Sequence, residues 1–142
     1  MGWWGKIIMK DSIIDMLGIA FIDGGRDPKR GLDCWGTTIE AYKILNNIVL
    51  PDFAIKAYQE ELISNQIIKE RNSDNWVEVS GPQKGCIVTF KLHPEFVNHV
   101  GVCIDDKTFI HARDKTGVCI ESFNHPLWKN KVYGFYRWIE TK

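Results

Sequence analysis

The chain has 142 residues, 44% of them apolar and 25% charged, which suits one domain over 1–142 with a single hydrophobic core. Its 18 basic and 18 acidic side chains leave a formal net charge of zero, which argues against a nucleic-acid partner or an anionic-membrane surface. No apolar run approaches the roughly 20 residues that cross a bilayer and the N-terminus carries no secretory signal, so we expect synthesis in the cytoplasm and no membrane insertion.

The first half of the chain predicts helices. Helix-starting residues before an apolar run predict a helix over 10–17, which Gly18 ends in the left-handed conformation. A loop dense in turn-forming residues covers 23–31. Apolar residues at three- and four-residue steps predict a helix over 34–47. A second helical stretch is expected over about 53–71, with buried positions at Ala54, Ala57, Tyr58, Leu62, Ile67 and Ile68.

The second half predicts a sheet. Short runs rich in Val, Ile and Phe alternate with turns, two of which are marked by Gly81-Pro82 and Asp105-Asp106. Helices followed by strands indicate an α+β fold, with N-terminal helices packed on a C-terminal antiparallel sheet. The expected strands are Trp76–Val79, Cys86–Leu92, His99–Ile104, Thr108–Ala112, Gly117–Glu121 and Val132–Trp138.

Four cysteines are present, and three of them lie inside apolar strand runs. Cys86, Cys103 and Cys119 are therefore expected to be buried thiols, and a disulfide among them stays open as an alternative. No pair has the Cys-x-x-Cys spacing of a zinc or redox site, so the sequence predicts no metal site and no cofactor.

Cys34 differs from the other three because the helical pattern begins at or just after it. Unpaired N–H groups and the positive dipole end at a helix start favour a thiolate. Gly31 and Gly36 on either side permit a tight loop-to-helix turn. Cys34 is therefore a candidate nucleophile, although a lone cysteine before a helix is more often a small buried side chain.

Two histidines on later strands are candidates for its proton acceptor. His99 opens one expected strand and His111 lies on the next, so the turn between them can make them cross-strand neighbours. One would act as the base and the other would fix its tautomer. Taken singly, each is more often a buried or edge residue, but order, spacing and element type agree. His93 and His125 precede proline and are expected in surface loops.

Five motifs in order cover nearly the whole chain and resemble the NlpC family of papain-like cysteine peptidases, which cut peptide stems of the bacterial cell wall. They are Leu17–Phe21 with Gly24-Gly25, Asp33-Cys34-x-Gly36, Gly85–Phe90, His99-Val100-Gly101 and Phe109–Ala112. The resemblance implies that Cys34 is the nucleophile, His99 the general base and His111 its orienting partner. It also implies that the Cys34 backbone N–H helps to bind the oxyanion. The implied substrate is the amide between D-glutamate and diaminopimelate, or a similar stem linkage.

The same resemblance implies substrate-binding roles for Asp33, Trp35, Gly36 and Phe21. The family usually has tyrosine at the position of Phe21, and phenylalanine removes a hydroxyl donor near the reacting carbonyl. Loss of one oxyanion-hole donor typically costs about 2.7–4 kcal/mol. Trp35, where many members have serine, alters the substrate side of the site.

Three features resemble the branch found with long-tailed bacteriophages: the Asp-Cys-Trp-Gly motif, Ile48–Phe53, and Trp128 before Tyr133–Arg137. They imply a tail-associated peptidoglycan endopeptidase with tail-tip proteins as partners, carried to the wall in a virion tail. The alternative is a structural tail-tip component with little activity, which Phe21 favours. An amidase or acyltransferase is weaker, because the sequence shows no lipid groove.

Overall fold

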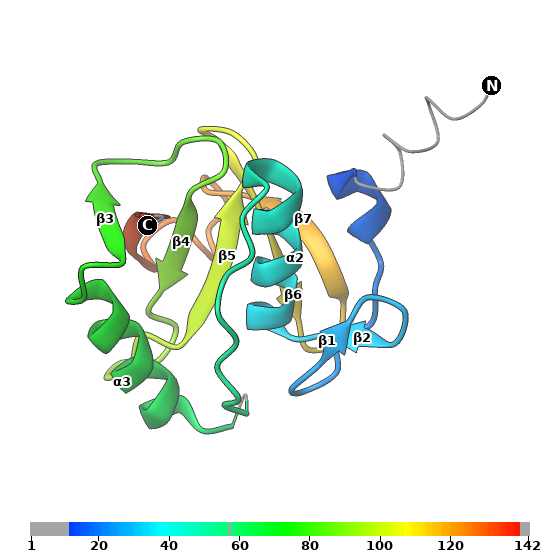
Figure 1. The fold of residues 1–142 in the computed structure, drawn as a ribbon, viewed down its shortest axis with the longest axis horizontal. Helices are drawn as coiled ribbons and strands as arrows, with labels where there is room; N and C mark the ends of the chain where they lie inside the picture. Colours follow the sequence, from blue (N-terminus) through cyan, green and yellow to red (C-terminus); the bar gives the residue numbers. More distant parts are fainter. Residues whose placement is uncertain (1–11, 57, 140–142) are drawn as a thin grey trace.

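The computed structural model describes residues 12–56 and 58–139. Within them, a six-stranded antiparallel sheet has the order β3-β8-β4-β5-β6-β7, and the hairpin β1-β2 precedes α2. Helix α2 packs on β5 and β6, whereas α3 lies by β3 (Figure 1). The predicted α+β fold is confirmed. The elements are η1 (Ile13–Met16), β1 (Arg26–Asp27), β2 (Gly31–Leu32), α2 (Cys34–Asn46), α3 (Glu60–Arg71), β3 (Trp76–Val79), β4 (Ile87–Phe90), β5 (His99–Cys103), β6 (Thr108–Arg113), β7 (Gly117–Ser122) and β8 (Val132–Trp138).

The core has apolar clusters on both sides of the sheet. Ala41 of α2 packs with Val102 of β5 and Ile110 of β6. A second cluster gathers buried aromatic rings and thiols, namely Cys86, Val88, Phe90, Cys103, Phe109 and Trp128. Because alternate residues of a strand point to opposite faces, β5 and β6 contribute to both clusters. These two strands are therefore held firmly where they carry the candidate histidines.

The helix that begins at Cys34 is confirmed, and its ends follow from local chemistry. Asp33 is the N-cap and accepts a hydrogen bond from the Gly36 N–H, whereas Asn47 ends the helix in the left-handed conformation at φ 57°. Gly18 also adopts the expected positive φ, at 86°. The helix predicted over 10–17 is a single 3₁₀ turn, capped by Ser12, and residues 10 and 11 lie outside the described part.

The prediction of a long helix over 53–71 is wrong in its first third. Helix α3 begins at Glu60, and Phe53 lies in an irregular segment. The Phe53 carbonyl accepts a hydrogen bond from Arg26, and the Lys56 N–H donates to the Gln59 side chain. These partners take backbone groups that a helix would use internally.

The predicted burial of that stretch is also wrong. Ile67 is half-buried, whereas the other described positions are exposed: Ala54, Tyr58, Leu62 and Ile68; Ala57 lies outside the described residues. The fully buried residue of α3 is Ser64, whose hydroxyl accepts from the Val97 N–H. The contact of Ser64 with Val97, and not the apolar pattern of α3, therefore marks the covered face of this helix.

Candidate active site

Cys34 is the first residue of α2 and is half-buried. The turn that presents it is tightly packed, since a Cβ atom on Gly36 would lie 2.2 Å from the carbonyl oxygen of Gly25. A larger residue at 36 would therefore push the helix start away from the preceding loop. The lack of a side chain at Gly36 therefore has a structural role. Its substrate-binding role stays a prediction.

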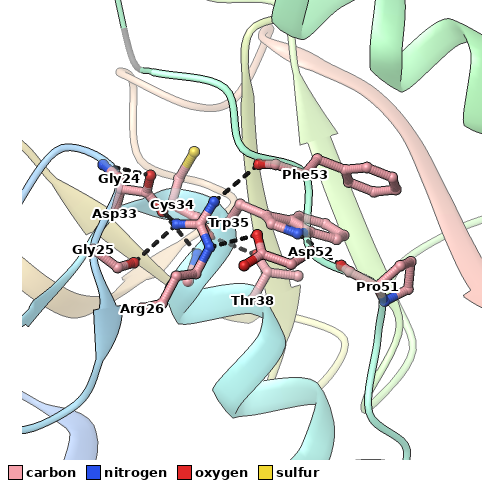
Figure 2. A network of polar contacts seen from close by, with 11 residues as sticks. Gly24, Gly25, Arg26, Asp33, Cys34, Trp35, Thr38, Pro51, Asp52 and Phe53 are labelled. Atoms are coloured by element: carbon pink, nitrogen blue, oxygen red, sulfur yellow. Dashed lines mark hydrogen bonds and ion pairs between the residues drawn. The ribbon is translucent and has the colours of Figure 1, made fainter.

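The carboxylate of Asp33 organises this turn from inside. It is 4% exposed, and its Oδ1 accepts from the Gly36 N–H at 2.8 Å and from Arg26 Nη1 at 2.7 Å, while Oδ2 accepts from the Gly24 N–H at 3.0 Å. Figure 2 shows Gly24 and Arg26 donating to the carboxylate beside Cys34. These bonds engage both carboxylate oxygens, so Asp33 holds the turn that leads into Cys34.

Arg26 extends that support to the segment after α2. Its Nε donates to Asp52 at 2.7 Å and its Nη2 to the Phe53 carbonyl at 3.0 Å. The Trp35 indole N–H donates to the Pro51 carbonyl, and its ring packs on Phe53 at 5.3 Å between centroids (Figure 2). The residue after Cys34 is thus fixed against residues 51–53. Sequence reasoning did not single out Arg26.

The surroundings of the Cys34 thiol favour its protonated form. Burial raises the pKa of Cys34 to about 12 and the charge of Asp33 adds to it, although the Val100 N–H and the charge of Arg26 act the other way. Val100 follows His99 directly, so the thiol lies at the start of β5. A thiol of this kind needs a base at the moment of attack.

His99, His111 and Glu121 form a hydrogen-bonded chain across three strands. His99 Nε2 lies 2.7 Å from His111 Nδ1, and His111 Nε2 lies 2.7 Å from Glu121 Oε2. His111 is fully buried, whereas His99 and Glu121 are half-buried. The structure therefore brings the two predicted histidines together and adds a carboxylate that the sequence analysis missed. The carboxylate could have been found from the strand register, because Cys119 pairs opposite His111 and Glu121 lies two residues beyond Cys119 on the same strand.

The carboxylate fixes the tautomers of both rings. Burial raises the pKa of Glu121, but the nearby Trp128 indole N–H, the hydrogen bond with His111 and the charge of Arg113 lower it, and the net pKa is below its ordinary value. An ionised carboxylate only accepts, so His111 carries its proton on Nε2 and accepts at Nδ1. His99 then carries its proton on Nε2, which leaves Nδ1 with a free lone pair.

Burial favours the neutral form of both imidazoles. Burial lowers the pKa of His99 to about 3, and the neighbouring charges of His111 and Arg113 act in the same direction. Burial also lowers the pKa of His111, against the opposing effect of Glu121. Trp128, singled out in the sequence only as a feature of the phage-tail branch, packs on both rings. Its ring centroid lies 6.0 Å from that of His99 and 4.9 Å from that of His111. The surroundings thus favour a neutral thiol and neutral imidazoles.

An apolar cavity opens beside Cys34. The space in it that water-sized solvent can occupy is about 100 Å³, and its walls include Trp35, Phe53, Ile67, Trp76, Ile87 and Val100. The sequence alone gave no sign of this apolar cavity. Phe21, predicted to bind substrate, is half-buried and packs on the cluster containing Leu32 and Val102.

In the described part of the chain, no helix is both long and apolar enough to cross a bilayer.

The fold combines a cysteine at a helix start with a hydrogen-bonded histidine chain on the sheet. The chain belongs to the NlpC/P60 family, whose pattern it matches over residues 18–137. It is 26% identical over 126 residues to the Escherichia coli murein DD-endopeptidase MepS/murein LD-carboxypeptidase, and 26% identical over 127 residues to the E. coli probable endopeptidase YafL. The alignments cover 89% and 85% of this chain but 59% and 45% of those proteins.

Solved structures agree with the fold. A lipoprotein-like NLP/P60 protein from Staphylococcus aureus superposes with a TM-score of 0.66 at 22% identity, covering 96% of this chain and 41% of its own. An NlpC/P60 protein from Bacillus cereus gives 0.63 at 27% identity, covering 88% and 37%. The NlpC/p60 domain of the peptidoglycan hydrolase SagA gives 0.56 at 20% identity, covering 93% and 96%.

Proposed function

We propose that this chain is a cysteine endopeptidase that cleaves an amide bond in peptidoglycan stem peptides. The observation that carries the proposal is the His99–His111–Glu121 chain, which leaves His99 Nδ1 as the acceptor for a proton from Cys34. Family membership and the names of the murein endopeptidases that it resembles support the substrate class. The D-glutamyl–diaminopimelate bond, or a similar stem linkage, is the proposed site of cleavage.

In the proposed mechanism, the sulfur of Cys34 attacks the amide carbonyl carbon while its proton passes to His99 Nδ1. The Cys34 backbone N–H donates to the oxyanion. Collapse breaks the C–N bond, and the imidazolium returns the proton to the leaving amine. Water then attacks the thioester carbon while His99 Nδ1 accepts its proton. The imidazolium returns this proton to the Cys34 sulfur as the acid product leaves. Through His111, the charge of Glu121 stabilises the imidazolium that forms on His99.

We further propose a phage or prophage tail as the setting, with tail-tip proteins as partners. The motifs that suggested it have defined places in the fold: Trp35 packs on Phe53, and Trp128 packs on both candidate histidines. Mass spectrometry of purified particles from the strain that carries the gene tests this setting. The chain is expected in the tail fraction, and its absence there would exclude the proposed setting.

The apolar cavity favours a second candidate, transfer or hydrolysis of an apolar acyl group. Cys34 lines the cavity, so an acyl chain bound there would place its carbonyl near the sulfur. A series of 4-nitrophenyl esters from acetyl to decanoyl distinguishes the two candidates. Rates that rise steeply with chain length, without any release of stem peptides from sacculi, would favour acyl transfer. Absence of both activities, with no labelling of Cys34 by a thiol-reactive probe, would favour the structural tail component.

A further inference from the structure

At the Glu121 end of the histidine chain, three side-chain atoms that could bind a metal ion lie close together. His111 Nε2, Cys119 Sγ and Glu121 Oε2 all lie within 4.8 Å of one another. His111 is paired directly opposite Cys119 across β6 and β7, and Glu121 lies two residues further along β7 on the same face. The register of β6 with β7 therefore places the three side chains next to one another on the same face of the sheet.

The spacing of these atoms suits a small tetrahedral cation. Zinc bonds of about 2.0–2.3 Å place adjacent tetrahedral ligands about 3.3–3.6 Å apart. Cys119 Sγ lies 3.7 Å from Glu121 Oε2, close to that value, whereas the 2.7 Å between His111 Nε2 and Glu121 Oε2 must widen when a metal replaces the shared proton. One imidazole, one thiolate and one carboxylate form a donor set that zinc accepts.

A cation can approach from the side of β7. Cys119 and Glu121 are both half-buried, and the deeper ligand, His111, lies behind them. The guanidinium of Arg113, 3.6 Å from Glu121 Oε2, opposes a cation here. Its side chain is 39% exposed, so it can turn into solvent when the carboxylate binds a metal instead.

We propose that His111, Cys119 and Glu121 bind Zn²⁺, with solvent as the fourth ligand, and that bound zinc switches the peptidase site off by reversing the tautomers of both histidines. The binding half stands on the cluster geometry alone, whereas the switching half rests on the proposed function. Zinc takes the lone pair of His111 Nε2, which forces that ring to carry its proton on Nδ1. His99 Nε2 must then accept, so His99 carries its proton on Nδ1 and has no lone pair for Cys34.

Protons balance in this change. The two neutral rings hold one proton each before and after it, because the proton lost from His111 Nε2 is matched by one gained at His99 Nδ1. The proton between the rings moves from His99 Nε2 to His111 Nδ1. The Cys119 thiol releases the one net proton.

Binding is tested without activity by titrating Co²⁺ into the Cys34→Ser variant, which removes the candidate nucleophile as a competing thiol. A thiolate-to-cobalt absorption band is expected, and it should disappear in Cys34→Ser/Cys119→Ser. Since loss of an outer partner alone costs about 10–100-fold in metal affinity, Glu121→Gln in the Cys34→Ser background should weaken Co²⁺ at least about tenfold. A missing band, or a band that survives Cys119→Ser and so comes from Cys86 or Cys103, would overturn the site.

The switch is tested by Zn²⁺ inhibition, with each protein compared with its own metal-free activity. The parent protein is expected to lose at least about tenfold in rate and to recover with a chelator, whereas Cys119→Ser should lose under about twofold. Equal inhibition of both proteins would overturn the switch. If the metal-free protein has no peptidase activity, the proposed function fails, and ¹⁵N spectra of the imidazoles still decide the switch. Zinc should move the proton-free nitrogen of His99 from Nδ1 to Nε2, and unchanged His99 signals would overturn it.

Discussion

His99 Nε2 lies 2.7 Å from His111 Nδ1, and the other ring nitrogen of His99, Nδ1, takes no part in this contact. The contact alone permits either direction of donation. Glu121, 2.7 Å from the far nitrogen of His111, removes the choice because an ionised carboxylate can only accept. The basic nitrogen of His99 is therefore set by a residue two hydrogen bonds away.

Removal of Glu121 should lower activity through the tautomers of the rings. Glu121→Ala is expected to lower kcat on the order of 100-fold with little change in KM, below the ~10⁴-fold cost of disturbing a direct orienting partner. Glu121→Gln keeps an acceptor but loses the charge, so its loss should be smaller, about tenfold. Glu95→Gln, in an exposed loop, is the matched control. An unchanged kcat in Glu121→Ala would contradict this role.

Asp33 should matter for stability as well as for the position of Cys34. Asp33→Ala removes a helix cap, worth about 0.5–2 kcal/mol, and leaves Arg26 and the Gly24 N–H without this acceptor. An unsatisfied buried donor costs about 1–3 kcal/mol, so the free energy of unfolding should fall by about 2–4 kcal/mol in urea denaturation. Asp27→Ala, which removes an exposed pair with Arg30, should cost under about 1 kcal/mol. Equal costs would show that Asp33 is not the support of the turn.

The raised pKa of the Cys34 thiol, about 12, predicts the pH dependence of its alkylation. Below that pKa the thiol holds its proton, so the thiolate fraction grows about tenfold with each pH unit. Iodoacetamide labelling of the Cys34 peptide, followed by mass spectrometry, should accelerate accordingly from about pH 6 to pH 9. A rate that is constant over this range would instead indicate a resting thiolate–imidazolium pair.

Trp128 should hold both histidine rings in place. It is 5% exposed and also packs on Phe90 and Phe109. Trp128→Ala is expected to cost about 3–5 kcal/mol in unfolding free energy. Trp128→Phe should keep most of the stability yet lower kcat, because the smaller ring leaves the imidazoles room to turn. If Trp128→Phe has full activity, Trp128 is only a core residue.

Much of the fold followed from local patterns in the chain. The N-cap at Asp33, the left-handed Gly18 and the strand Val132–Trp138 were readable because their signals involve neighbouring residues. The segment before α3 was not, since Arg26, 27 residues upstream of Phe53, takes the carbonyl that a helix would use. Contacts between distant segments override helix propensity there.

The site was predictable to a similar extent. Cys34, His99 and His111 stood out by order and spacing, and the structure joins the two histidines as cross-strand reasoning expected. Glu121 was missed because an acidic residue near a strand end usually faces solvent, and only the register of β6 with β7 turns it toward His111. The apolar cavity beside Cys34 was missed because α2, α3 and the sheet build it jointly.

Digestion of purified sacculi, read by mass spectrometry of the released fragments, decides whether Cys34 acts as a peptidase nucleophile. Parent protein and Cys34→Ala are compared under metal-free conditions, with urea denaturation showing that both are folded. The parent should release fragments with a new amino terminus within the stem peptide, and Cys34→Ala should release none. Identical fragment profiles from the two proteins, or intact sacculi with both, would contradict the proposed function.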